Sequence, residues 1–479
     1  MRVKWIGAAV CAVTIFAVRL IAQGGQTTAP ATGQAQAGAA QEQPPDDIRT
    51  LVGRLELEKF KGTLKGLTQF GDRREGTQRN RDAVDWIEAQ LKSFGCPTGR
   101  LTYEVQPRVG GGGGGAAGAA GGAAGAAGGG AGAAGAQTGQ RGAGQQAGAA
   151  QAGQAGAAQG QAGAQGQRAG GGGGGGGRGQ TLGPLAQPVR NSSGGSTLYG
   201  NRGRTGVNNN AEAQPDEKLR ALNAGPVIPG PIPFVFCTKI GATNPNEMYI
   251  IGAHMDGIGW GEAANDDGSG TALVMELARV FSAPDVVTDR TIRFALWNGE
   301  EGGLRGARAY VTQRESLQGR EDPPGSGRYP EPKWLGMIQH DMMMFDHGMP
   351  RADGTLSPEQ RPEADFNIEW QSNSKMADAS MKLALAVKLA ADKYTTDYPG
   401  MLGPHMTNTD SGPFQDIVAA ISLRENERGM NTGAGWNPHW HQPTDLFKTF
   451  SDKDFKLGLN AGQATLSAIA QLTGAKIKK

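Results

Sequence analysis

Histidine and carboxylate side chains gather in five short motifs in the second half of the chain. All six histidines lie between positions 254 and 441. The motifs are His254-Met-Asp256, Asn265-Asp266-Asp267, Glu300-Glu301, His340-Asp341 and His439-Trp-His441. Imidazole and carboxylate together suit a zinc-type divalent cation. A carboxylate shared by two ions and a neighbouring glutamate that holds water are parts of a two-metal hydrolase. The motifs therefore indicate metal-assisted hydrolysis.

Each motif has a plainer explanation when it is considered alone. Most His-x-Asp pairs are ordinary surface polar residues, and an Asn-Asp-Asp turn more often caps a helix or forms a loop. Adjacent glutamates such as Glu300 and Glu301 are weaker evidence still. The combination is hard to obtain by chance, because four of the motifs lie at the ends of predicted strands. We therefore expect the motifs to form one site.

Hydrophobic periodicity predicts alternating helices and strands that place these motifs. Apolar residues at helical spacing predict helices over 48–67, 78–94, 271–282, 304–313, 375–392 and 452–472. Short apolar runs predict strands over 101–105, 234–237, 247–254, 291–297, 334–341 and 418–423. This order predicts an α/β fold, a three-layer domain with a mostly parallel mixed sheet flanked by helices. In such sheets the chemistry lies at the carboxyl ends of the strands.

The charge balance argues against a nucleic-acid partner, and one segment of unusual composition interrupts the chain. The 47 Lys and Arg residues nearly balance the 45 Asp and Glu residues, a net charge of +2, so we expect no nucleic-acid partner. Residues 110–180 comprise 33 Gly, 23 Ala, 11 Gln, 3 Arg and 1 Thr. Such a segment cannot bury enough apolar surface to offset the entropy of ordering. We predict a disordered Gly/Ala/Gln-rich insertion there, inside one large domain over 48–479, with order resuming near Pro226.

The first residues have the order of a secretory signal peptide. Two basic residues precede an apolar run from Trp5 to Val18, and Ala22 is a small residue near its end. The run is short for a membrane span. We predict a signal peptide over 1–23, a flexible tether over 24–47, and a secreted or periplasmic location without a stable membrane span. An uncleaved N-terminal anchor is the alternative.

The predicted mature chain has two cysteines, Cys96 and Cys237. In an exported protein they could form a disulfide. Two separately buried thiols are the favoured alternative, because the sequence does not show whether their Cα atoms come close enough for a bond. There is no Cys-x-x-Cys pair, which argues against a thiolate zinc site.

At the five motifs the sequence resembles the secreted zinc exopeptidases of family M28, which includes bacterial aminopeptidases and the carboxypeptidase Q group. The resemblance begins at Phe70-Gly-Asp-Arg-Arg-Glu-Gly-Thr and ends at Pro443-Thr-Asp445. The spacing from His254 to Asp266 and the Leu-Trp-x-x-Glu-Glu strand look most like the carboxypeptidase Q group.

The resemblance implies two zinc ions per chain and a role for each matching residue. It implies that His254 and Asp341 bind one ion, that Glu301 and His441 bind the other, and that Asp266 bridges both. Glu300 would be the general base. Asp256 would orient His254 as the acceptor of its other ring nitrogen. The peptide bond Asp266–Asp267 is expected to be cis.

The sequence also departs from the family pattern. The family often has Ser-Asp-His before its penultimate strand, whereas this chain has Thr409-Asp410-Ser411. Trp440 replaces a usual tyrosine before the last ligand. Where many carboxypeptidase Q-like chains insert a protease-associated domain, this chain has low-complexity glycine.

The resemblance implies a secreted two-zinc exopeptidase that hydrolyses terminal bonds of peptide substrates, with aminopeptidase activity favoured over carboxypeptidase or dipeptidase activity. Two alternatives remain. One is a non-catalytic scaffold on the same fold. The other is a one-zinc acyltransferase similar to the glutaminyl cyclases, which share the fold.

Overall fold

The computed structural model describes residues 46–105, 207–347, 359–404, 409–425 and 437–478. The predicted signal peptide over 1–23 and the insertion over 110–180 lie outside these residues. The predicted tether over 24–47 overlaps them at its end, because helix α1 (Asp47–Val52) begins at Asp47. No helix within the described ranges is both long and apolar enough to cross a membrane.

An eight-stranded mixed sheet forms the centre of the fold, with strand order β1-β2-β5-β3-β6-β9-β7-β8. Its central neighbours β5, β3, β6 and β9 are parallel, whereas β1, β2 and β7 each form an antiparallel pair. The strand bounds are Thr98–Tyr103 (β1), Ile232–Lys239 (β2), Asn244–His254 (β3), Arg290–Trp297 (β5), Lys333–His340 (β6), Phe366–Trp370 (β7), Gly400–Gly403 (β8) and Ala420–Glu425 (β9). Strands β4 (Val286–Val287) and β10 (Lys476–Ile477) form a separate small sheet.

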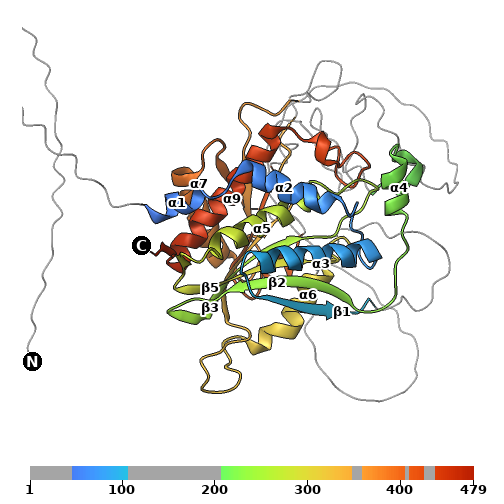
Figure 1. The fold of residues 1–479 in the computed structure, drawn as a ribbon. Helices are drawn as coiled ribbons and strands as arrows, with labels where there is room; N and C mark the ends of the chain where they lie inside the picture. The colour runs from blue at the N-terminus through green and yellow to red at the C-terminus, as the bar shows by residue number, and fades with distance from the viewer. Residues whose placement is uncertain (1–45, 106–206, 348–358, 405–408, 426–436, 479) are drawn as a thin grey trace, which may run out of the picture. The chain divides into compact units, whose positions relative to one another are not determined.

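Helices cover both faces of this sheet, as Figure 1 shows for α5 and α6, which lie on opposite sides of strands β2 and β3. The larger apolar core packs α2, α3, α5, α7 and α9 against one face, and the smaller core packs α6 against the other. The remaining bounds are Leu57–Thr68 (α2), Gln78–Ser93 (α3), Glu217–Asn223 (α4), Gly268–Phe281 (α5), Arg305–Arg314 (α6), Ala377–Tyr394 (α7) and Asp452–Thr473 (α9). The predicted three-layer α/β fold is confirmed.

Two local predictions were wrong, and two short strands of the sheet were missed. The helical pattern over 48–67 forms two helices, because Gly53 ends α1 and α2 begins only at Leu57. Strands β7 and β8 were not predicted, since each has only four or five residues. Order resumes before Pro226, with α4 and the turn before it. That segment is anchored by buried amide side chains and has no apolar stripe, so periodicity could not reveal it.

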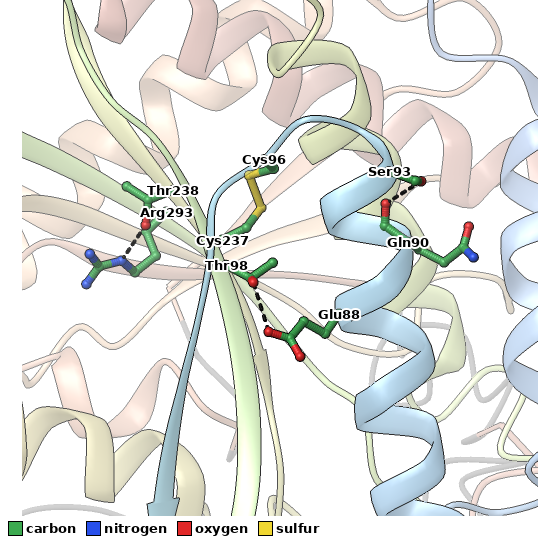
Figure 2. Close-up of a disulfide and its surroundings, with 8 residues drawn as sticks. All are labelled: Glu88, Gln90, Ser93, Cys96, Thr98, Cys237, Thr238 and Arg293. Carbon is green, nitrogen blue, oxygen red and sulfur yellow. Dashed lines mark hydrogen bonds between the residues drawn. A yellow bond between two sulfur atoms is a disulfide. The ribbon is translucent and has the colours of Figure 1, made fainter.

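Cys96 and Cys237 form a disulfide, which decides between the two alternatives for these cysteines. Figure 2 shows Cys96 in the turn that leads from α3 into β1, and Cys237 on the neighbouring strand β2. Their Cα atoms are 5.6 Å apart, within the range that a disulfide requires. The bond therefore joins the turn before β1 to strand β2, and its two cysteines are 141 positions apart in the sequence.

Candidate metal centre and active site

The predicted site residues converge at the carboxyl ends of the central parallel strands. His254 is the last residue of β3, and Asp341 directly follows β6. Glu300 and Glu301 lie in the turn after β5, and Asp266 lies just before helix α5. Because β5, β3 and β6 are adjacent and parallel, these ends meet at one edge of the sheet. The fifth motif joins them from the loop that precedes α9.

The carboxylate of Asp266 lies between two histidine rings. Its Oδ1 atom is 3.3 Å from Nε2 of His254, and its Oδ2 atom is 3.0 Å from Nε2 of His441. The same His254 nitrogen is 3.7 Å from Oδ1 of Asp341. The same His441 nitrogen is 2.8 Å from Oε2 of Glu301. One carboxylate thus touches both histidines, and each histidine has a second carboxylate of its own.

These side chains form two groups that could each hold a cation. The first comprises His254, Glu300 and Asp341, and the second comprises Asp266, Glu301 and His441. Within each group, one candidate ligand atom from every residue lies within 4.8 Å of the others. Mixed imidazole and carboxylate donors at this spacing suit zinc or a similar ion.

Orphaned oxygen atoms provide an independent test of that fit. Oε1 of Glu301 and Oδ1 of Asp341 are buried and have no hydrogen-bond partner among the residues that the structure describes. Buried carboxylate oxygens are normally paired, and an exception calls for an ion or a water. Both atoms belong to the two candidate groups. The residues present therefore fit a pair of bound cations.

The raised pKa values of the two histidines reflect an excess of negative charge in the site. Burial lowers the pKa of His441, but Glu301 and Asp266 outweigh burial and raise that pKa to about 10. Burial also lowers the pKa of His254, yet the nearby carboxylates of Asp266 and Asp341 bring it well above its usual value. In a site without ions, protons on the imidazoles would thus compensate the carboxylates. Divalent cations would supply the same positive charge.

Glu300 lies beside the candidate ligands with a strongly perturbed carboxyl group. Burial raises its pKa well above the ordinary value. His254 opposes this shift, whereas the carboxylates of Glu301 and Asp341 add to it. A raised pKa makes the carboxylate a better proton acceptor near neutral pH.

Asp256 lies in the site, but its contacts differ in part from the prediction. Nδ1 of His254 is 3.0 Å from the main-chain oxygen of Asp256 and 3.8 Å from its carboxylate. A ring N–H donated to that main-chain oxygen leaves Nε2 free to bind a cation. The Asp256 carboxylate instead accepts the backbone N–H groups of Glu300, at 3.2 Å, and Glu301, at 3.4 Å. The residue therefore positions both glutamates as well as the histidine.

Asp267 ties three backbone segments of the site together. Its carboxylate accepts N–H groups from His254, Gly270 and Met342 at 3.1, 2.9 and 3.1 Å. These residues end β3, begin α5 and follow β6, respectively. The peptide bond Asp266–Asp267 is cis, as expected.

Two further buried acids support the site, and sequence reasoning had assigned no role to either. Asp445 accepts the backbone N–H groups of Asn265 and Asp266. Glu425 accepts the side-chain amide of Asn265 at 2.7 Å and the backbone N–H of Phe345 at 2.8 Å. Glu425 is the last residue of β9, so an acid that ends an apolar strand was the signal that could have revealed it.

Two of the departures from the family pattern lie among the described residues. Oγ of Ser411 lies 2.6 Å from Oγ of Ser422, and both residues are buried. Asp410 is also buried, and burial raises the pKa of its carboxyl group. The Trp440 ring stacks on the His441 ring with centroids 3.7 Å apart. Trp440 thus packs directly against a candidate ligand.

Residues 236–457 match the family model of peptidase family M28. The match covers just under half of the chain and contains the motifs that carry the resemblance. An aminopeptidase of Pseudomonas aeruginosa (strain UCBPP-PA14) is 43% identical over 137 residues, which cover 27% of this chain and 24% of that protein. Aminopeptidase YwaD of Bacillus subtilis (strain 168) is 41% identical over 68 residues, 14% of each protein. The chain therefore spans about a quarter or less of the length of these curated relatives.

Solved structures with a similar fold include an aminopeptidase from Aneurinibacillus sp. strain AM-1, with a TM-score of 0.48 and 16% identity. The likeness covers 90% of this chain and 97% of that one. The Legionella pneumophila LapA aminopeptidase has a TM-score of 0.48 and 13% identity, over 92% of this chain and 82% of its own.

The M28 match contains all seven predicted site residues, from His254 to His441. Some buried residues that hold the loops of the site lie outside the matched range. Arg73 donates to the main-chain oxygens of Met255, Glu262 and Ala263, at 2.7–2.8 Å, and so holds the loop that leads to Asp266. The side chain of Arg73 is fully buried. The M28 region is thus completed by segments of the chain that precede it.

Proposed function

We propose that this chain is a two-zinc exopeptidase that removes residues from the amino end of peptides. The observation that carries the proposal is the placement of the Asp266 carboxylate, 3.3 Å from His254 and 3.0 Å from His441. A carboxylate in contact with both histidines is what a pair of ions sharing one bridging ligand requires.

His254 and Asp341 would hold one zinc ion, Glu301 and His441 the other, and Asp266 both. The orphaned oxygens of Glu301 and Asp341 support this division, because each belongs to a different group. Bound zinc would polarise the scissile carbonyl group and lower the pKa of the attacking water.

Glu300 would act as the general base. Its carboxylate would accept a proton from the attacking water and return it to the leaving amine. Burial and the neighbouring carboxylates raise its pKa, which makes the carboxylate a stronger acceptor for that proton. Asp256 would keep Glu300 and Glu301 in place through their backbone N–H groups.

The amino-end direction and the location are also proposals. The similar proteins of Pseudomonas aeruginosa and Bacillus subtilis are named aminopeptidases, which favours substrates with a free amino terminus. The basic and apolar start of the sequence supports export to a secreted or periplasmic location. The Cys96–Cys237 disulfide supports the same location, because disulfides persist in oxidising compartments.

Zinc analysis of the purified protein, combined with assays on short peptides, tests the function. We expect two zinc ions per chain and release of the first residue from unblocked peptides. Acetylation of the amino terminus and treatment with a chelator should each abolish that release. A chain without zinc and without hydrolysis would support a scaffold. One ion with cyclisation of N-terminal glutamine would support an acyltransferase.

A further inference from the structure

We propose that Gln214 is a positioning residue that clasps the loop of His441 to the loop between β3 and α5. Through this clasp it would maintain the second cation group, Asp266, Glu301 and His441. This inference rests on the proposed two-zinc function. The residue lies before the M28 match, which begins at residue 236.

The side chain of Gln214 joins two loops of the site. Its Nε2 atom donates to the main-chain oxygen of Trp260 at 2.7 Å and to that of Pro443 at 3.0 Å. Trp260 lies between His254 and Asp266, and Pro443 lies two residues after His441. The residue is 1% exposed, so water does not replace these bonds.

The clasp is itself held in place from both sides. Oε1 of Gln214 accepts the backbone N–H of Asp216 at 3.1 Å. Nη1 of Arg220 donates to the main-chain oxygen of Gln214 at 2.7 Å. Asp216 is the N-cap residue of helix α4, and Arg220 lies in its last turn. These contacts with Asp216 and Arg220 fix the orientation of the Gln214 side chain toward the two loops.

A second contact from the same segment reaches the candidate ligand directly. The backbone N–H of Asn208 donates to the main-chain oxygen of His441 at 3.1 Å. The side-chain Nδ2 atom of Asn208 donates to Oε1 of Gln442 at 3.3 Å. The segment over 208–214 thus holds the backbone of His441 and of the residues that follow it.

The two loops need such support because their backbones are strained and closely packed. His441 has φ +57° and Trp260 has φ +69°, a conformation that costs free energy for residues with a side chain. Gly259 approaches so closely that a Cβ atom there would lie 2.3 Å from the main-chain carbon of His441. A small shift of either loop would therefore move the His441 ring.

The first cation group depends much less on the clasp. His254 belongs to strand β3, and the backbone N–H of Asp341 donates to Leu423 of the neighbouring strand β9. Sheet hydrogen bonds thus position those ligands. Loss of the Gln214 bonds should weaken one zinc site and spare the other.

Zinc titration of the metal-depleted full-length protein, followed by calorimetry, tests this inference. The informative variant is Gln214→Met, which keeps the length of the side chain and removes its amide. We expect one ion to bind as in the wild type and the other to bind roughly tenfold more weakly, the lower end of the effect of losing an outer partner of a ligand. The matched control is Gln463→Met, which alters a buried glutamine that bonds Thr396 and neither loop.

Each outcome has a defined meaning. Two ions bound with wild-type affinity by Gln214→Met would overturn the inference and leave the two-zinc function standing. Fewer than two ions on the wild-type protein would overturn the function itself. Should Gln214→Met fail to fold, Gln214→Asn keeps the amide but is one methylene too short to reach both loops. Wild-type zinc affinity in that variant would equally reject the clasp.

Discussion

The carboxylate of Asp445 accepts the backbone N–H of Asp266, with Oδ2 and N 3.1 Å apart. Its other oxygen accepts the N–H of Asn265 at 2.8 Å. Asp445 is 2% exposed, and burial raises its pKa to about 7, although these two hydrogen bonds lower it. An acid from the His441 loop thus fixes the backbone of the carboxylate that lies between the two histidines.

We expect Asp445→Asn to weaken both folding and zinc binding. An amide presents one acceptor and one donor, so one of the two backbone N–H groups loses its partner. The free energy of unfolding should fall by about 1–3 kcal/mol, the usual cost of an unsatisfied buried group. Urea unfolding and zinc titration measure the two effects. Asp452→Asn is the control, because its pair with Lys61 lies at the surface and should contribute little to stability. Equal effects of both substitutions would contradict the role of Asp445.

Glu300→Gln should abolish most turnover and keep both zinc ions. A general base contributes a factor of roughly 10²–10⁴ to the rate, and an amide cannot accept the proton. Steady-state kinetics on an unblocked peptide and zinc analysis of the same sample measure this difference. The neighbouring variant Glu301→Gln should lose zinc as well as turnover. An undiminished kcat in Glu300→Gln would remove Glu300 from the role of base.

Replacing both Cys96 and Cys237 by serine should lower the free energy of unfolding by about 2–5 kcal/mol. The bond closes a loop of 141 residues, and its loss enlarges the conformational freedom of the unfolded chain. Denaturant unfolding with and without reductant measures the effect. Wild-type stability should fall in reductant, and the double variant should not respond. A reductant-insensitive wild type would show that the bond contributes nothing.

Deletion of residues 110–180 should leave kcat/KM within about twofold of the wild-type value. The free energy of unfolding should stay within about 0.5 kcal/mol of the wild-type value, as for changes outside the packed core. The flanking strands β1 and β2 pair from Thr98–Cys237 to Tyr103–Ile232, so their own ladder holds the ends together. Kinetics and thermal unfolding of the shortened chain test this. Loss of folding would mean that the low-complexity segment contributes to the domain.

Acidification should destabilise the fold through His340, which is fully buried beside Thr465, with Nε2 and Oγ1 2.9 Å apart. Burial lowers its pKa to about 4, against an ordinary value near 6.5. Below pH 6.5 His340 therefore binds a proton in the unfolded chain but not in the folded chain. The free energy of unfolding consequently falls as the pH decreases toward 4.

Between pH 7 and pH 5 this single residue should lower the free energy of unfolding by about 2 kcal/mol. Urea unfolding of the wild type and of His340→Gln at both pH values isolates the contribution. The variant should lose correspondingly less stability on acidification. An identical loss in both proteins would exclude His340 as the cause.

Much of the fold could be predicted because its signals are local. The strands that end at His254, Trp297 and His340 are apolar runs, and their ends carry the acids and histidines of the site. Adjacent parallel strands bring such ends together, so the candidate site followed from the order of the elements. Short or polar elements were missed. Strand β8 has four residues, and helix α4 has a single buried residue, Asn223, so neither has a recognisable hydrophobic periodicity.

The alternation of helices and strands, the residue types of the site and their resemblance to family M28 could be read from the sequence, because they depend on neighbouring residues and on motif spacing. Three contacts became visible only in the folded chain: Cys96 bonds to Cys237, the Asp256 carboxylate holds the two glutamates, and Gln214 joins the site loops. These contacts link residues up to 229 positions apart. Such pairings arise from the way the layers pack, which no local pattern records.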